Sequence, residues 1–376
     1  MSRIASIEIS HHSMPLDPPF KASWDGRDRV QFDATVVRVR DEDGREGVGS
    51  GDLMLGFQGH EDLFVGRDPR DLSRHTDVLS HIDFHYGRPW PLDLALQDLA
   101  GQIAEEPVWR RLGGRSDRLR LYASSGVARD AEALADQAHR FVEEGFQGLK
   151  IRLSATQGGR GGWREDVKAL EAVRARVGGA LALMVDCNQG WRMPWDTAPA
   201  WTFKQALEVA KALEPLDITW LEEPLHRADL KGMAALRQAT SIPIAGGEMT
   251  RELTAFRDLI EARALDILQP DCALVGGITG LARVAEAALA ANLRFTPHSW
   301  TNGLGVLANA HLAAGAAGSE WFEWPHDPPE WSPERRDFLL AQPLERKGGV
   351  YHLPLAPGLG AVLDEDRLRA TRLGDV

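Results

Sequence analysis

The sequence predicts an α/β protein, a (β/α)8-type (TIM-like) barrel preceded by a smaller α+β capping domain. Three observations predict this class. From Leu119 onward, eight short apolar runs alternate with helical patterns over about 220 residues, the length of such a barrel. Before Leu119, strand patterns precede helical ones without alternation, which is typical of an α+β unit. Ionisable residues follow most of the apolar runs, where barrels of this class place reactive groups.

Composition excludes several other classes. The chain has 376 residues, 43% hydrophobic and 26% charged, which suits a folded protein with a sizeable core. Its net charge of -12 argues against nucleic acid or an anionic membrane as a partner. No run approaches the roughly 20 apolar residues of a membrane span, and residues 1–20 lack a secretory signal. Cys187 and Cys272 are the only cysteines and favour a reduced, cytoplasmic setting; we expect both to be buried.

Three patterns define the capping unit. Alternation over Ile4–Ser10 predicts a strand. Residues 34–40 and 47–51 flank the turn signal Asp43-Gly44 and predict a hairpin with a glycine-rich exit. Apolar residues recur with helical spacing over residues 92–103, so a helix follows the hairpin.

The barrel is predicted to span residues 119–345 and the capping domain residues 1–118, with residues 346–376 packing back on the capping domain. Asp130 is expected to cap the first barrel helix, and Thr202 with Gln205 forms a capping box before the third. Every strand but the last is clearly followed by a helical pattern. The predicted strands are Leu119–Ala123, Leu149–Leu153, Leu181–Val185, Ile218–Leu221, Ile242–Ala245, Ile267–Gln269, Leu293–Thr296 and Trp321–Phe322.

Three carboxylates end consecutive strands of this barrel. Asp186, Glu222 and Glu248 follow strands three, four and five, so they can converge on one point. Hard oxygen ligands with open positions suit Mg²⁺, whereas the His and Cys ligands that zinc favours are missing from the set. Any one of these residues alone would be read as a surface acid, but three in succession favour a metal site.

Two further pairs of ionisable residues lie at strand ends. Asp271 and His298 end strands six and seven, and an Asp can orient an imidazole and raise its basicity. The alternative is a structural histidine with a hydrogen-bonded partner. Lys150 and Arg152 alternate on strand two, so both point the same way and supply local positive charge. They balance the three carboxylates, a role that is compatible with catalysis.

The order of these motifs resembles the mandelate racemase subgroup of the enolase superfamily. The intervals Glu222 to Glu248, Glu248 to Asp271 and Asp271 to His298 are 26, 23 and 27 residues, each a single βα unit, and the resemblance covers nearly the whole chain. The motifs are Lys150-x-Arg152, Asp186-x-Asn188, Glu222-Glu223-Pro224, Gly246-Gly247-Glu248, Gln269-Pro270-Asp271 and Pro297-His298-Ser299.

The resemblance implies a site and a reaction. It implies that Mg²⁺ is bound by the three carboxylates and that a proton next to a substrate carboxylate is abstracted. It also implies that Lys150 holds the substrate carboxylate, that Asn188 assists nearby, and that Glu323, at the end of strand eight, donates to or orients the intermediate.

Two features depart from the subgroup. Arg152 stands where the racemases carry a second lysine, and a guanidinium is an unlikely base. The interval from Asp186 to Glu222 is 36 residues, longer than one tight βα unit. The excess, Arg192–Trp201, either shapes specificity or is a decorated loop.

Trp24, in the capping unit, is expected to close over the barrel mouth and contact substrate, or else to be an ordinary packing residue.

The favoured function is dehydration of a sugar acid to a 2-keto-3-deoxy acid. His298 is expected to take the α-proton and return it to the departing hydroxyl, while Arg152 binds a hydroxyl or a second carboxylate. The many polar groups favour a polyol acid over an aromatic one. Alternatives are a racemase or epimerase of a 2-hydroxy acid and a non-catalytic metal-binding barrel. We expect a homo-oligomer, and the run Gly158–Gly162 is expected to be a loop or linker.

Overall fold

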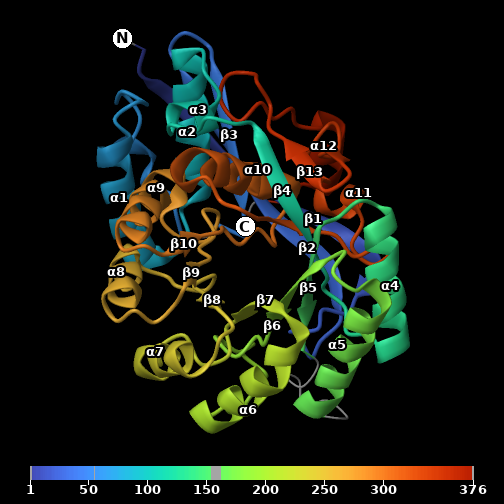
Figure 1. Cartoon of the computed structure of the whole chain (residues 1–376). Coiled ribbons are helices and arrows are strands. Elements are labelled where there is room, and N and C mark those ends of the chain that lie inside the picture. Colours follow the sequence, from blue (N-terminus) through green and yellow to red (C-terminus); the bar gives the residue numbers. More distant parts are fainter. Residues whose placement is uncertain (1, 55, 154–161, 375–376) are drawn as a thin grey trace.

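The structure is a computed structural model, and it describes residues 2–54, 56–153 and 162–374. Three antiparallel strands begin the chain in the order β1-β2-β3, as the hairpin pattern predicts for β2 and β3. Figure 1 shows a ring of parallel strands, with the helices of this first unit along one edge of the ring. The elements are β1 (Ile4–Phe20), β2 (Arg29–Asp41), β3 (Glu46–Gly51), α1 (Leu72–Tyr86), α2 (Pro91–Ala104) and α3 (Val108–Arg111).

Glycines in β3 allow the first sheet to lie directly on α2. A Cβ at Gly47 would lie 2.2 Å from the carbonyl oxygen of Ala95, and one at Gly49 would lie 2.1 Å from that of Pro91. Only glycine allows two backbones to come this close. The sheet is more extensive than predicted, because β1 continues to Phe20. Helix α1 was not predicted, and only four of its residues are buried, which leaves little periodic signal.

Eight parallel strands form the barrel, and all eight predicted strands are confirmed. They are hydrogen-bonded in sequence order from the first to the seventh, and the eighth pairs with the first. Ser319, just before the eighth strand, donates from Oγ to the carbonyl oxygen of Phe295 in the seventh over 2.6 Å. The strands are β4 (Arg118–Ser124), β5 (Gly148–Arg152), β6 (Ala182–Asp186), β7 (Ile218–Glu222), β8 (Ile244–Gly246), β9 (Ile267–Leu268), β10 (Arg294–Phe295) and β11 (Phe322–Pro325).

Helices follow the first seven barrel strands. The Asp130 side chain accepts from the backbone N–H of Ala133, and Thr202 with Gln205 forms the predicted capping box. Both cysteines are buried beneath these helices, as expected. The eighth strand, β11, is followed directly by the short helix α11 (Pro333–Arg336). The longer helices are α4 (Ala131–Glu143), α5 (Trp163–Val177), α6 (Phe203–Leu213), α7 (Leu230–Ala239), α8 (Leu253–Glu261), α9 (Gly277–Ala290) and α10 (Gly303–Leu312).

The C-terminal segment contacts both parts of the chain. Strand β12 (Arg346–Lys347) pairs with β13 (Val350–His352), which pairs antiparallel with β4. Leu368 of α12 (Glu365–Thr371) packs in one apolar cluster with Ala34 of β2. The limits proposed for the capping domain and the barrel stay a prediction. In the described part of the chain, no helix is long and apolar enough to cross a membrane.

Candidate active site

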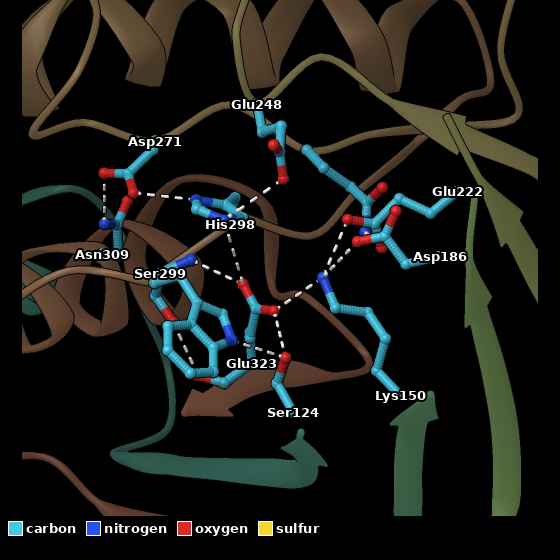
Figure 2. A network of polar contacts seen from close by, with 12 residues as sticks. Ser124, Lys150, Asp186, Glu222, Glu248, Asp271, His298, Ser299, Asn309 and Glu323 are labelled. Carbon is cyan, nitrogen blue, oxygen red and sulfur yellow. Dashed lines mark hydrogen bonds and ion pairs between the residues drawn. The ribbon is translucent and has the colours of Figure 1, made fainter. Parts of the chain in front are cut away.

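Three carboxylates converge at one end of the barrel, as their places in the sequence predict. Asp186 and Glu222 are the last residues of β6 and β7, and Glu248 lies two residues beyond β8. One carboxylate oxygen from each lies within 4.8 Å of the others. All three are buried, with at most 3% of their surface exposed. Figure 2 shows them grouped above Lys150.

Lys150 neutralises part of this negative charge from below. Its Nζ lies 2.8 Å from Glu222 Oε1, 2.7 Å from Glu323 Oε1 and 3.5 Å from Asp186 Oδ2. Burial by itself would lower the pKa of Lys150, but the carboxylates of Glu222 and Glu323 raise it above its usual value. The lysine is therefore a fixed cation in the floor of the site.

Arg152 is a second fixed cation, held from three sides. Its Nη1 lies 2.5 Å from Asp186 Oδ2 and donates to Asn188 Oδ1 over 3.2 Å. Its Nε donates to the carbonyl oxygen of Ser125. The indole of Trp24, from the segment between β1 and β2, lies 4.4 Å from the guanidinium carbon. Trp24 therefore lies at the barrel mouth, and its contact with substrate stays a prediction.

Asp271 and His298 form the expected pair. Asp271 Oδ2 lies 3.0 Å from His298 Nδ1, while Oδ1 accepts from Asn309 Nδ2 over 2.8 Å. This leaves His298 Nε2 facing the carboxylates, 3.2 Å from Glu248 Oε2. Burial would lower the pKa of His298, but the carboxylates of Glu248 and Glu323 raise it to about 9.

Glu323 lies between the histidine and the lysine (Figure 2). It stands within β11, because that strand runs on to Pro325, past the predicted end. Its Oε1 accepts from Ser124 Oγ and its Oε2 from the backbone N–H of Ser299, over 2.8 Å and 2.7 Å. Burial opposes ionisation, but Lys150 and His298 lower the pKa of Glu323 to about 2.

The residues of the cluster fit a hard divalent cation. Glu248 Oε2 is buried without a hydrogen-bond partner in the described structure. Burial and the neighbouring Asp186 raise the pKa of Glu222 to about 7 in spite of Lys150. Glu248 Oε2 therefore faces the ion pair with His298 without a hydrogen bond, and the raised pKa of Glu222 reflects burial and like charge close by, which a divalent cation would relieve. Carboxylate oxygens are the ligands that Mg²⁺ uses in proteins.

A cavity of about 310 Å³ opens above the cluster between the first sheet and the barrel. Four of the predicted site residues line it: Trp24, Arg152, Glu248 and His298. Asn188 lines a small recess beside it, together with Trp24. The other predicted residues lie beneath the cavity floor and are almost completely buried: Lys150, Asp186, Glu222, Asp271 and Glu323.

Sequence reasoning missed the residues that orient these groups. Trp191 Nε1 donates to Glu248 Oε1 over 2.6 Å, and Gln269 Nε2 donates to Glu222 Oε2 over 3.0 Å. Gln269 belongs to the motif Gln269-Pro270-Asp271, so the sequence displayed it without indicating this contact. Trp191 directly precedes the Arg192–Trp201 segment, for which the sequence left two roles open. Gly158–Gly161 of the predicted glycine-rich loop lie outside the described residues.

Comparison with known proteins agrees with this architecture. The family model "Enolase C-terminal domain-like" matches residues 133–367. The chain is 31% identical over 272 residues to arabinonate dehydratase of Saccharolobus solfataricus, which covers 72% of this chain and 68% of that one. It is 30% identical over 400 residues to L-talarate/galactarate dehydratase of Salmonella typhimurium, covering 99% and 92%. L-talarate dehydratase of Polaromonas sp. JS666, solved with Mg and L-glucarate, superposes with a TM-score of 0.82, 27% identity and coverage of 100% and 98%.

The fold and site are those of a barrel enzyme with a carboxylate cluster that could bind a metal. This chain belongs to the enolase superfamily, in its mandelate racemase subgroup. Its relatives are sugar acid dehydratases together with cycloisomerases, racemases and epimerases. The chain is therefore an enzyme, and its relatives include both lyases and isomerases.

Proposed function

We propose that this enzyme is a Mg²⁺-dependent hydro-lyase that dehydrates a sugar acid to a 2-keto-3-deoxy acid. Asp186, Glu222 and Glu248 would hold the Mg²⁺. When bound there, the ion would neutralise the substrate carboxylate and the charge that develops on it as the α-proton leaves. The relatives that act as dehydratases support the reaction type.

The observation that carries the proposal is that the cavity has one candidate base, His298, and a permanent cation, Arg152, where a second base would be needed. Among the described residues that line the cavity, His298 is the only imidazole and no lysine is present. Arg152, which occupies the position of a second base, has a pKa raised further by Asp186 in spite of burial. A guanidinium stabilises charge but does not shuttle protons. Removal of a proton from one face therefore fits the site better than racemisation.

The mechanism follows from the side chains in place. Asp271 holds His298 Nδ1, so in the neutral imidazole Nε2 carries the lone pair that accepts the α-proton. Glu248 contributes most to the raised pKa of His298, so neutralising Glu248 favours the basic form of the imidazole. Lys150 and Glu323 lie next to the cluster and would orient the substrate carboxylate.

The atoms balance without a further reactant. The C2–H bond breaks first, and its proton passes to His298. The C3–O bond then breaks as the imidazolium returns that proton to the leaving hydroxyl. Water departs, a C2=C3 enol forms, and its tautomerisation gives the 2-keto-3-deoxy acid.

Proton NMR in D₂O with Mg²⁺ and a panel of sugar acids tests the proposal. We expect loss of water, or deuterium uptake at C2 with retained configuration. His298→Asn should abolish both outcomes, whereas His352→Asn, which alters a half-exposed histidine far along the chain, should change neither. Steady interconversion of C2 epimers by the unmodified enzyme would refute the one-base mechanism and establish the epimerase alternative. Absence of any exchange at C2 would refute acid–base catalysis at this site.

We further propose that the enzyme is a cytoplasmic homo-oligomer. Its two cysteines are free, which suits a reducing compartment. Phe84 on α1 is 79% exposed and Tyr86 is 56% exposed, and we propose that these two rings lie at a contact between subunits. Light scattering coupled to gel filtration tests the assembly, and a monomeric mass at micromolar concentration would contradict it.

A further inference from the structure

We propose that the substrate is hydroxylated at C2 and C3 and apolar beyond C3, so that the enzyme takes a sugar acid deoxygenated at its far end. This inference rests on the proposed function and names the substrate class more narrowly. The cavity constrains the substrate in two ways. Its floor binds a carboxylate and reacts at the adjoining carbons, and its walls must match the remainder of the substrate.

Aromatic rings make up one wall of the cavity. Phe20 and Phe32 come from β1 and β2, while Trp300 and Trp331 come from the barrel loops after β10 and β11. Trp300 stacks on Trp331 with ring centroids 5.4 Å apart, and Phe20 lies 5.0 Å from Trp331. These contacts fix the rings before any ligand enters. A rigid apolar wall of this kind favours an apolar ligand surface.

Aliphatic and thioether side chains continue the apolar lining. Met193 follows β6, Met249 follows the carboxylate of Glu248, and Leu274 lies in the turn after β9. Leu274 is 9% exposed. No Ser, Thr, Tyr or Asn side chain is among the described residues that line this cavity. Gln31 is the one neutral amide among the described residues of this lining, so most hydroxyls of a polyol entering here would lose water without gaining a neutral hydroxyl or amide partner.

Several polar side chains of the walls already have a partner within the protein. Arg29 Nε lies 3.3 Å from Asp25 Oδ2, and Arg88 forms an ion pair with Asp52. Gln31 donates to both carboxylate oxygens of Asp33. The indole N–H of Trp300 donates to Ser124 Oγ over 2.7 Å. A second carboxylate or a run of hydroxyls would have to share these groups with their present partners.

The sequence pattern favoured a polyol acid because it displayed many polar groups. The structure places most of those groups in the floor, where they contact one another and the carboxylate cluster. The walls come largely from aromatic residues that carry no motif. The far end of the substrate therefore meets a different chemistry from its carboxylate end.

A series of acids that share C2 and C3 configuration tests the inference. We expect kcat/KM to rise from a hexonate through the 6-deoxyhexonate to 2,3-dihydroxyhexanoate, by roughly ten-fold or more overall. The series is run for all four C2 and C3 configurations, with the corresponding aldarates as dicarboxylate probes. A hexonate or an aldarate as the best substrate would overturn the inference.

A pair of variants ties the preference to the walls. Leu274→Asn introduces an amide of similar size at the cavity and should reduce the preference for the deoxygenated acid several-fold. Leu259→Asn makes the same change at a residue of similar burial, 6% exposed, that does not line the cavity. It should leave the ratio of kcat/KM values unchanged, even if the protein is less stable. An equal ratio in the two variants would contradict the role of the wall.

Failure of this inference and failure of the proposed function give different results. If no acid in the series exchanges its C2 proton in D₂O, the proposed reaction is wrong. If exchange or dehydration occurs but the most hydroxylated acid reacts best, the reaction stands and only the apolar far end is refuted.

Discussion

At the scale of single residues, the site depends on side chains that orient the charged groups. Each oxygen of Glu248 faces a different neighbour: Oε1 accepts from Trp191, and Oε2 lies 3.2 Å from His298 Nε2. Trp191 therefore restricts rotation of this carboxylate. Partners of metal ligands commonly contribute ten- to a hundred-fold to metal affinity. We regard Trp191 as a positioning residue for the proposed metal site.

Trp191→Phe tests that role. The variant keeps the ring and removes the N–H, so we expect the dissociation constant for Mg²⁺ to rise about ten-fold. Isothermal titration with Mg²⁺ alone measures this without any substrate. Trp201→Phe is the matched control, because Trp201 uses only its backbone N–H to bind Gln189. Equal affinities in both variants and the parent would show that the Trp191 hydrogen bond does not support the metal.

At the scale of elements, the segment between β6 and α6 links the barrel to the first sheet. Arg192 holds this segment in shape, donating to the carbonyl oxygens of Asn188 and Pro199. Trp195 Nε1 donates to Asp25 Oδ1 over 3.0 Å, next to Trp24 above the cavity. These contacts favour the interpretation that the Arg192–Trp201 segment shapes specificity over the alternative of a decorated loop.

Trp195→Phe should therefore loosen the loop that carries Trp24. We expect KM for the preferred acid to rise several-fold while kcat changes less than two-fold, because Trp195 touches no group in the floor. Steady-state kinetics with a thermal melt measures both effects. Trp163→Phe, at the start of α5 with its ring beside Arg164, is the control and should leave KM unchanged. A fall in kcat without a change in KM would refute the positioning role.

The sequence allowed the barrel and floor to be predicted for one physical reason. Parallel strands bring their carboxyl ends to one place, so Asp186, Glu222 and Glu248 had to meet once the strands were recognised. The residues that line the walls of the cavity could not be predicted in this way. Phe20 and Trp331 lie more than 300 positions apart, and nothing in their local patterns shows that they meet. Apolar periodicity identifies burial but not which cavity a ring lines.

At the scale of the whole molecule, one buried histidine joins three distant segments. His311 in α10 accepts at Nδ1 from the backbone N–H of Trp109 over 3.0 Å. Its Nε2 lies 3.1 Å from the carbonyl oxygen of Leu359 in the C-terminal segment, so Nε2 carries the hydrogen. Burial lowers the pKa of His311 to about 4. The imidazole is therefore neutral in the folded protein at physiological pH.

This arrangement predicts a specific loss of stability in mild acid. Between pH 6.5 and pH 4 an unfolded His311 takes up a proton and the folded one does not, so stability falls as the pH falls. The full effect is about 3 kcal/mol in the free energy of unfolding, and by pH 5 roughly 2 kcal/mol is lost.

The variant His311→Gln tests this prediction, because glutamine keeps an acceptor and a donor but cannot titrate. Urea unfolding at pH 7.5 and pH 5 should therefore show a smaller loss for His311→Gln than for the parent. His139→Gln, at a half-exposed histidine of α4, should lose as much as the parent. The same acid-dependent loss in all three proteins would show that His311 does not link folding to pH.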